Sequence, residues 1–339
     1  MSERMDSPMF QQPMRSEMAT PPGATGGGSA PPPVRDGAGS SLNNAFMGPN
    51  GIRAGWRLLI FAAIVFVLLS VFGIVARAVL HGKQPKFTIA STAISEAVIF
   101  GLFLFASWVM TRIEGRKIAD YGLPARKAFG KNFWQGAIFG FVAMTILLVS
   151  LRLAGVFSFG TMALHGGEIL KYGAGWGVAF LFVGFFEEYS ARGYPQFTLT
   201  TGIGFWPSAI LISIAFGSLH LGNGGEDWIG ALSAGSAGLL LCFILRRTGD
   251  LWMSIGFHMA WDWAETFFYG VPDSGVVAPG HLLNPTFHGS KWLTGGSVGP
   301  EGSVLVFAIL VLCWTIVHFW QPEAKFPNPA ALAARPGQA

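Results

Sequence analysis

Residues 58–76 read LLIFAAIVFVLLSVFGIVA, a run without a charged side chain. An α-helix rises about 1.5 Å per residue, so this run covers about 28 Å, close to the thickness of the hydrocarbon core of a bilayer. The composition of the whole chain agrees, because 51% of its residues are hydrophobic and only 12% are charged. The sequence therefore predicts an integral membrane protein that is surrounded by a lipid bilayer.

Seven further apolar runs follow along the chain. The predicted spans cover residues 58–80, 88–111, 134–154, 174–192, 206–222, 227–245, 251–269 and 303–320. They indicate an all-α, polytopic bundle of about eight transmembrane helices. Lys and Arg are more frequent in the loops on the side of the termini, which predicts that both termini are cytoplasmic. In a bacterium, the membrane would be the plasma (inner) membrane.

Composition divides the chain into four segments. Residues 1–50 are rich in Pro, Gly and Ser and are predicted to form a disordered tail, and residues 323–339 a second one. Residues 51–160 hold the N-terminal transmembrane helices, and residues 161–322 form the membrane domain that carries the motifs described below. The formal net charge of +4 comes from scattered Lys and Arg without a long basic stripe, so we expect no nucleic-acid partner.

Several ionisable residues interrupt the apolar runs of the second half of the chain. The fourth span and the residues that follow it read VAFLFVGFFEEYSARGYPQF at residues 178–197, with Glu187, Glu188 and Arg192. The fifth span carries FGSLH with His220, and the seventh carries IGFHMAWDW with His258 and Asp262. Each such residue costs about 2.5–3.5 kcal/mol at the centre of a membrane helix unless it is paired or hydrated. Groups that are retained at this cost indicate a functional site.

The spacing of these residues suggests their roles. Glu188 and Arg192 are four positions apart, so they share a helix face and can form an ion pair. Glu187 points about 100° away and has no partner on its own helix, which makes it a candidate general base. His258 and Asp262 are also four apart, so the carboxylate could orient the imidazole, or both could converge on one ligand.

Two other interpretations compete with catalysis. A Glu–Arg pair in a membrane helix often holds helices together or belongs to a transport path, and single membrane histidines often pack with a hydrogen bond. The combination of Glu, Arg, His and Asp on three spans favours chemistry over both. There is no H-E-x-x-H motif, so the usual helix of zinc metalloproteases is absent from the sequence.

Three motifs resemble those of a known family. They are E-E-x-x-x-R at Glu187, Glu188 and Arg192, F-x-x-x-H at Phe216 and His220, and H-x-x-x-(N/D) at His258 and Asp262. They occur in this order on successive apolar segments and resemble those of the CPBP or Abi family of CAAX-processing and bacteriocin-processing intramembrane proteases. This family includes the type 2 CAAX prenyl endopeptidases, and the resemblance covers residues 170–268.

The resemblance implies an eight-helix fold with a conical catalytic cavity that faces the cytoplasm. By the same resemblance, Glu187 and His220 would activate a water, while His258 and Asp262 would stabilise the oxyanion. An ionised Asp cannot donate a hydrogen bond, so His258 would make the oxyanion contact and Asp262 would orient it. Phe216 would form part of the cavity wall. Glu188 and Arg192 would be structural.

The sequence leaves the role of metal open. Glu187, His220 and His258 could hold Zn²⁺ with an open position for water, as in a metalloprotease, or Glu187 could act as a general base without metal. The predicted boundaries also place Glu187 in the cytoplasmic half of the membrane but His220 about 21 Å from the cytoplasmic side, so the two depths disagree.

The function predicted from these residues is an intramembrane endopeptidase that hydrolyses an amide bond of a membrane-associated protein or peptide. Two alternatives remain. The chain could be a proton-coupled transporter that uses Glu187, Glu188 and His220 as a relay, although no inverted repeat is evident. It could also be a non-catalytic immunity or scaffold protein on the same fold.

Overall fold

A computed structural model describes residues 45–48, 51–83, 87–327 and 332. The predicted tails at 1–50 and 323–339 therefore lie largely outside the described residues. The described part of the chain is mostly helical, and each of the eight predicted spans corresponds to a helix. The helices are α2 (Ala54–Val79), α3 (Ile89–Glu114), α4 (Lys131–Leu153), α5 (Gly167–Arg192), α6 (Tyr194–Ile203), α7 (Phe205–His220), α8 (Trp228–Thr248), α9 (Trp252–Trp263), α10 (Lys291–Thr294) and α11 (Leu305–Trp320).

Five helical stretches of the described chain are long and apolar enough to cross a membrane. They are α2, α3, α4, the combined α5 and α6 stretch, and α8, while α7 and α11 are shorter apolar helices. Large apolar side chains on α2, such as Phe66 and Ile74, are exposed, as suits contact with acyl chains rather than with water. The prediction of an all-α, polytopic membrane protein is therefore confirmed.

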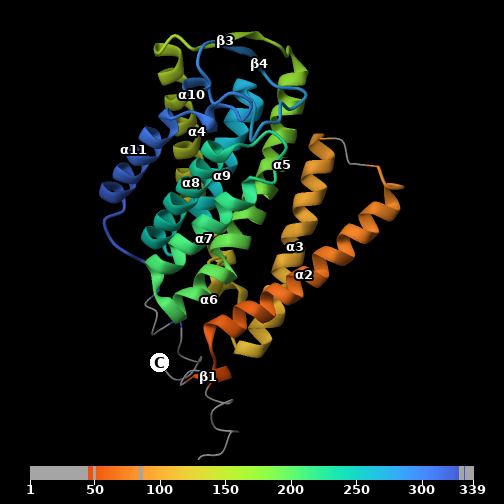
Figure 1. Ribbon diagram of the computed structural model, residues 1–339, viewed down its shortest axis with the longest axis vertical. Helices are drawn as coiled ribbons and strands as arrows, with labels where there is room; N and C mark the ends of the chain where they lie inside the picture. The colour runs from red at the N-terminus through yellow and green to blue at the C-terminus, as the bar shows by residue number, and fades with distance from the viewer. Residues whose placement is uncertain (1–44, 49–50, 84–86, 328–331, 333–339) are drawn as a thin grey trace, which may run out of the picture. The chain divides into compact units, whose positions relative to one another are not determined.

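Helix α9 lies in the centre of the bundle, in contact with α4, α5 and α8 (Figure 1). Glycines allow the closest of these contacts. A Cβ atom added to Gly136 of α4 would lie 2.0 Å from a backbone oxygen of α9, and one added to Gly140 would lie 2.1 Å from another. In the other direction, a Cβ atom added to Gly256 of α9 would lie 2.1 Å from the backbone oxygen of Phe133. The backbones of α4 and α9 thus touch where larger residues would separate them, as small residues allow in membrane bundles.

Helix α6 was not predicted, and it accounts for the disagreement between the membrane depths expected for Glu187 and His220. It begins with Pro195 in its first turn, where proline suits a helix because the first N–H groups have no partner. It adds about 15 Å of helix between α5 and the turn at Gly204. Glu187 lies 17 positions before Gly204 and His220 lies 16 positions after it. The two residues are therefore almost equally far along the chain from this turn.

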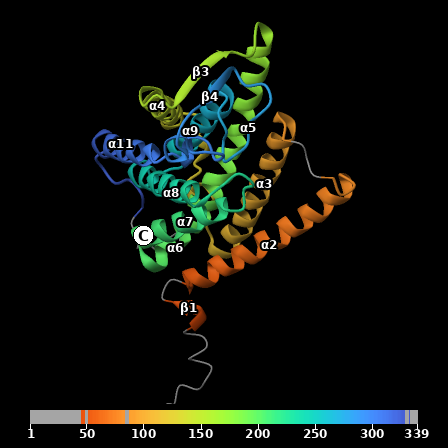
Figure 2. The same ribbon diagram turned by 45° about the horizontal axis from the view of Figure 1, so that its top comes forward.

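A two-stranded antiparallel sheet closes one end of the bundle (Figures 1 and 2). Strand β3 (Phe157–Met162) precedes α5, and β4 (Leu283–Phe287) lies in the connector between α9 and α11. Their pairing, with Phe157 opposite Phe287, ties this connector to the loop between α4 and α5. A second short pair, β1 (Met47–Gly48) with β2 (Gly51–Ile52), precedes α2. Neither sheet was predicted.

The described part of the C-terminal segment packs against α6 and α7. The ring centroid of Phe326 lies 4.6 Å from that of Phe197 and 4.8 Å from that of Phe205. The backbone N–H groups of Lys325 and Phe326 both donate to the carbonyl of Arg246. This segment therefore contacts the end of the bundle that carries α6.

Candidate active site

The buried centre of the site is an ion pair on the last turns of α5. Nη1 of Arg192 lies 2.7 Å from Oε1 of Glu188, and both side chains are fully buried. This is the i,i+4 pair that the sequence predicts. A buried pair of this kind is stable only if its remaining hydrogen-bonding capacity is met by neighbours, so the groups around it determine its role.

His258 of α9 contacts the carboxylate of this ion pair. Its Nδ1 atom lies 2.8 Å from the same Oε1 atom of Glu188. Its Nε2 atom faces two other carboxylates, at 3.5 Å from Glu187 and 3.6 Å from Asp262. When Nδ1–H donates to Glu188, the orientation of the ring is fixed and Nε2 is directed towards Glu187 and Asp262.

Helix α7 contributes Phe216 and His220. The guanidinium carbon of Arg192 lies 4.4 Å from the centroid of the Phe216 ring, a cation–π contact inside the bundle. Nδ1 of His220 lies 2.8 Å from the carbonyl oxygen of Phe216, where only Nδ1–H can make the hydrogen bond because a carbonyl accepts. In the Nδ1–H tautomer that this hydrogen bond selects, Nε2 of His220 keeps a lone pair.

A cavity of about 50 Å³ lies among these side chains. His220, His258, Asp262 and Glu301 are among the residues that line it, together with apolar side chains of α7, α8, α9 and α11. This volume is large enough for water, and the lining offers the polar partners that a buried water needs. Side chains from the fifth and seventh predicted spans therefore share one cavity, whose lining is mostly apolar and does not include Glu187 of the fourth span.

The structure brings the seven predicted site residues into one connected group. Glu187, Glu188 and Asp262 all approach His258, Arg192 joins Glu188 to Phe216, and Phe216 contacts His220. The carboxylate that accepts the hydrogen bond from the His258 imidazole belongs to Glu188, whereas the sequence suggested Asp262. Spacing within one helix could not reveal this contact, because it depends on how α5 and α9 are rotated against each other.

Two further acidic residues belong to the site and were missed. Glu96 on α3 lies near enough to Glu187 for their carboxylates to repel each other. Glu301, in the turn Pro300–Gly302, lines the cavity and accepts a hydrogen bond of 2.8 Å from the indole nitrogen of Trp261. Glu96 did carry a signal, because it is the only charged residue between positions 88 and 111. Glu301 carried none, since it lies in a connector.

Glu187, His220 and His258 together form a set of donors that Zn²⁺ accepts. In the described residues, however, these three side chains do not form a group whose ligating atoms all lie within 4.8 Å of one another. The Nδ1 atom of His258 is also bonded to Glu188. The mechanism proposed below therefore uses the side chains alone, and the zinc site stays a prediction.

The fold and this cluster define a helical membrane protein with a carboxylate and histidine site inside its bundle. Residues 170–264 match the family model described as type II CAAX prenyl endopeptidase Rce1-like. The match confirms the resemblance seen in the motifs, and it spans all seven predicted site residues from Glu187 to Asp262. No curated protein and no solved structure was found to match the chain.

Proposed function

We propose that the chain is an intramembrane endopeptidase that hydrolyses a peptide bond with a water activated by Glu187. The observation that carries this proposal is the position of His258, between the buried Glu188 at Nδ1 and the partly exposed Glu187 at Nε2. This arrangement places a candidate base next to an oriented imidazole, and His258 itself lines the cavity. The match to a CAAX endopeptidase family supports the same reaction class.

In the proposed reaction, the Glu187 carboxylate removes a proton from water as the water oxygen attacks the scissile carbonyl carbon. His220 helps to position this water through its free Nε2 atom. The carbonyl oxygen becomes an oxyanion, which accepts a hydrogen bond from Nε2–H of protonated His258. Glu187 then passes its proton to the leaving amine nitrogen as the C–N bond breaks. The products are a carboxylic acid and an amine.

The buried Glu188 and Arg192 act on His258 in this scheme. In the protonated imidazole both nitrogens donate, one to Glu188 and the other towards the oxyanion. Arg192 balances the charge of the buried Glu188 carboxylate. We propose that Asp262 keeps His258 aligned at its outer edge.

The substrate class follows from the bilayer and from the family. A site inside a helix bundle is reached by chains that are themselves bound to the membrane, and the matched family is named for prenylated CAAX proteins. We therefore propose a membrane-associated protein or peptide as substrate, with a prenylated C-terminal peptide as the first probe. We also propose that the cavity opens towards the cytoplasm, on the same side as both termini.

Cleavage of a farnesylated CAAX peptide by the purified protein in liposomes tests the proposal. The wild type should cleave this peptide, and Glu187→Gln should not. Glu168→Gln, which changes an exposed glutamate at the start of the same helix, is the matched control and should cleave normally. If the wild type leaves this peptide intact, new protein termini in whole membranes should be compared between wild type and Glu187→Gln. Identical termini would reject the proposal.

A further inference from the structure

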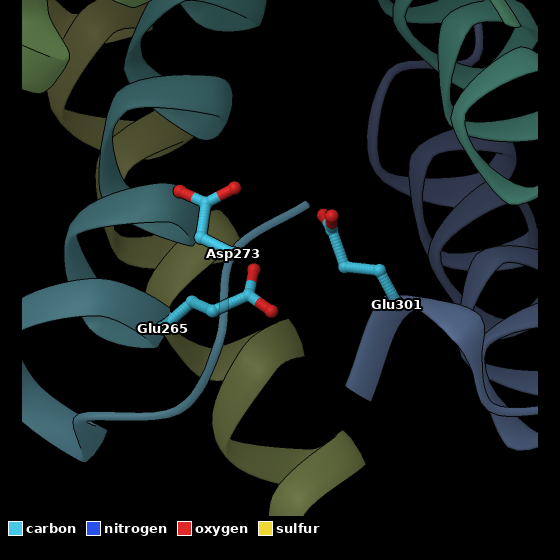
Figure 3. A group of neighbouring side chains, drawn as sticks. All are labelled: Glu265, Asp273 and Glu301. Atoms are coloured by element: carbon cyan, nitrogen blue, oxygen red, sulfur yellow. The ribbon is translucent and has the colours of Figure 1, made fainter. Parts of the chain in front are cut away.

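Three carboxylates, one of which lines the cavity, converge on one another, and all lie outside the segment that matches the family. Glu265 lies in a π-helical turn (Ala264–Tyr269) after α9, Asp273 in the connector, and Glu301 in the turn before α11. Each offers one carboxylate oxygen that lies within 4.8 Å of the others (Figure 3). The three residues come from separate parts of the chain, so the fold has brought them together.

Glu265 has no partner for its charge among the residues that the structure describes. Its side chain is fully buried, and neither of its two carboxylate oxygens has a hydrogen-bond partner in the described structure. Figure 3 shows its carboxyl group pointing into the gap that Asp273 and Glu301 also face. Buried carboxylates are normally paired or bind a metal, so an unpartnered one aimed at two others indicates a missing ligand of positive charge.

The other two carboxylates are held in place by neighbouring donors. Oδ2 of Asp273 accepts from the hydroxyl of Thr266 at 2.9 Å, and Oε1 of Glu301 accepts from the indole N–H of Trp261 at 2.8 Å. Each bond engages one oxygen of a group that has two. The cluster is thus positioned before any ligand arrives, which lowers the entropy cost of binding.

The negative charge of these three carboxylates requires compensation. Among the described residues, no Lys or Arg forms an ion pair with Glu265, Asp273 or Glu301. Burial, followed by the repulsion of neighbouring carboxylates, raises the pKa of both Asp273 and Glu301 above the ordinary values. Either a cation or bound protons must therefore offset this charge.

We propose that Glu265, Asp273 and Glu301 bind a hard divalent cation, and that this cation is Ca²⁺. All the candidate ligands are oxygens, which disfavours zinc and other metals that prefer nitrogen or sulfur. Ca²⁺ takes several protein oxygens in flexible geometry, whereas Mg²⁺ keeps several waters and is usually bound by only one or two carboxylates. Three carboxylates that converge within 4.8 Å of one another therefore suit Ca²⁺.

The cation would join three elements around the cavity. It would fix the connector and the turn before α11 to the end of α9, and Glu301 is itself part of the cavity wall. Its effect is on stability and on the shape of the wall. The inference does not depend on the proposed hydrolysis, because cation binding can be measured without a substrate.

Terbium luminescence measures binding directly. Tb³⁺ occupies calcium sites, and here it would lie near the indole of Trp261, which can sensitise its emission. The full-length protein in detergent, freed of metal with EGTA, should show this emission, and Ca²⁺ should displace Tb³⁺ at lower concentration than Mg²⁺. Glu265→Gln should weaken Tb³⁺ binding at least tenfold, and Glu168→Gln should not. Unchanged binding by Glu265→Gln would overturn the site, and better displacement by Mg²⁺ would overturn the choice of ion.

Thermal unfolding provides the second readout. Ca²⁺ at a hundredfold excess over its Kd should raise the Tm of the wild type by roughly 5 °C. Glu265→Gln should show no such rise. If Glu265→Gln does not fold, Asp273→Asn replaces it, because Asp273 lies in the connector and is only partly buried. A wild-type Tm that is independent of Ca²⁺, together with absent Tb³⁺ emission, would show that protons neutralise the cluster and would reject the proposal.

Discussion

The Nδ1 atom of His258 and the Nη1 atom of Arg192 both contact a single oxygen, Oε1 of Glu188, at 2.8 and 2.7 Å. One buried carboxylate thus connects α5 to α9 and links a permanent positive charge to an imidazole. Glu188 and Arg192 were expected only to hold the structure together. The contact of Glu188 with His258 gives the pair a second effect, on the orientation of the ring, and this effect can be separated from stability.

The first prediction separates these two effects. Glu188→Met leaves Arg192 buried without a partner, which should destabilise the protein by about 3–5 kcal/mol. The double variant Glu188→Met with Arg192→Met removes both charges and should recover most of this stability. Its cleavage rate should nevertheless stay at least tenfold below the wild type, because His258 has lost the carboxylate that orients it. Thermal unfolding and initial rates measure the two effects. Full recovery of the rate in the double variant would show that Glu188 is only structural.

The second prediction concerns Asp262, whose Oδ2 atom lies 3.6 Å from Nε2 of His258. Asp262→Asn should retain cleavage within about tenfold, because the amide can donate a hydrogen bond to the oxyanion. Asp262→Ala removes both the charge and the hydrogen-bonding group and should lose about 10²-fold or more. Steady-state kinetics on the same peptide compare the two. If Asn and Ala are equally inactive, a hydrogen-bonding group at position 262 is not sufficient, and the negative charge of Asp262 is what the site requires.

The third prediction tests the contact between α4 and α9. Gly140→Val places atoms where even a Cβ would lie 2.1 Å from the carbonyl oxygen of Phe257, the residue next to His258. The helices must separate, so the Tm should fall and cleavage should fall by about 10²-fold, as expected for a misplacement of about 1 Å. Gly101→Val on α3 is the control, since a Cβ there meets nothing within 4 Å. If the two variants have the same Tm and the same cleavage rate, the close packing of α4 against α9 does not have the proposed importance.

The fourth prediction distinguishes the two possible uses of metal. Phenanthroline, which removes zinc, should change the cleavage rate less than about twofold if Glu187 activates water alone. EGTA, which removes calcium, should lower the Tm through the cluster around Glu265. Loss of cleavage in phenanthroline and its recovery on addition of Zn²⁺ would instead support a zinc site at Glu187, His220 and His258.

The sequence was sufficient for the membrane helices, because long apolar runs leave few alternatives in a bilayer. It was not sufficient for α6, whose ten residues include Gln196 and several threonines and are too short to signal a span. The strands β3 and β4 were also missed, because they are far apart in the chain and each is short.

The contacts of the candidate site were likewise predicted only in part from the sequence. Pairs within one helix, such as Glu188 with Arg192, follow from helical spacing and were predicted. The contact of Glu188 with His258 depends on the packing of two helices, which sequence spacing does not encode. The cluster of Glu265, Asp273 and Glu301 was missed for a further reason. Acidic residues in connectors are usually solvated, so only the fold reveals that these three are brought together.

The most direct test of the central claim is cleavage of the prenylated peptide in H₂¹⁸O by wild type and Glu187→Gln. The account predicts one ¹⁸O atom in each new C-terminal carboxylate. It also predicts a rate for Glu187→Gln that is about 10²–10⁴-fold lower than that of the wild type, at an unchanged Tm. Labelled product that Glu187→Gln forms at the wild-type rate would contradict the assignment of Glu187 as the base.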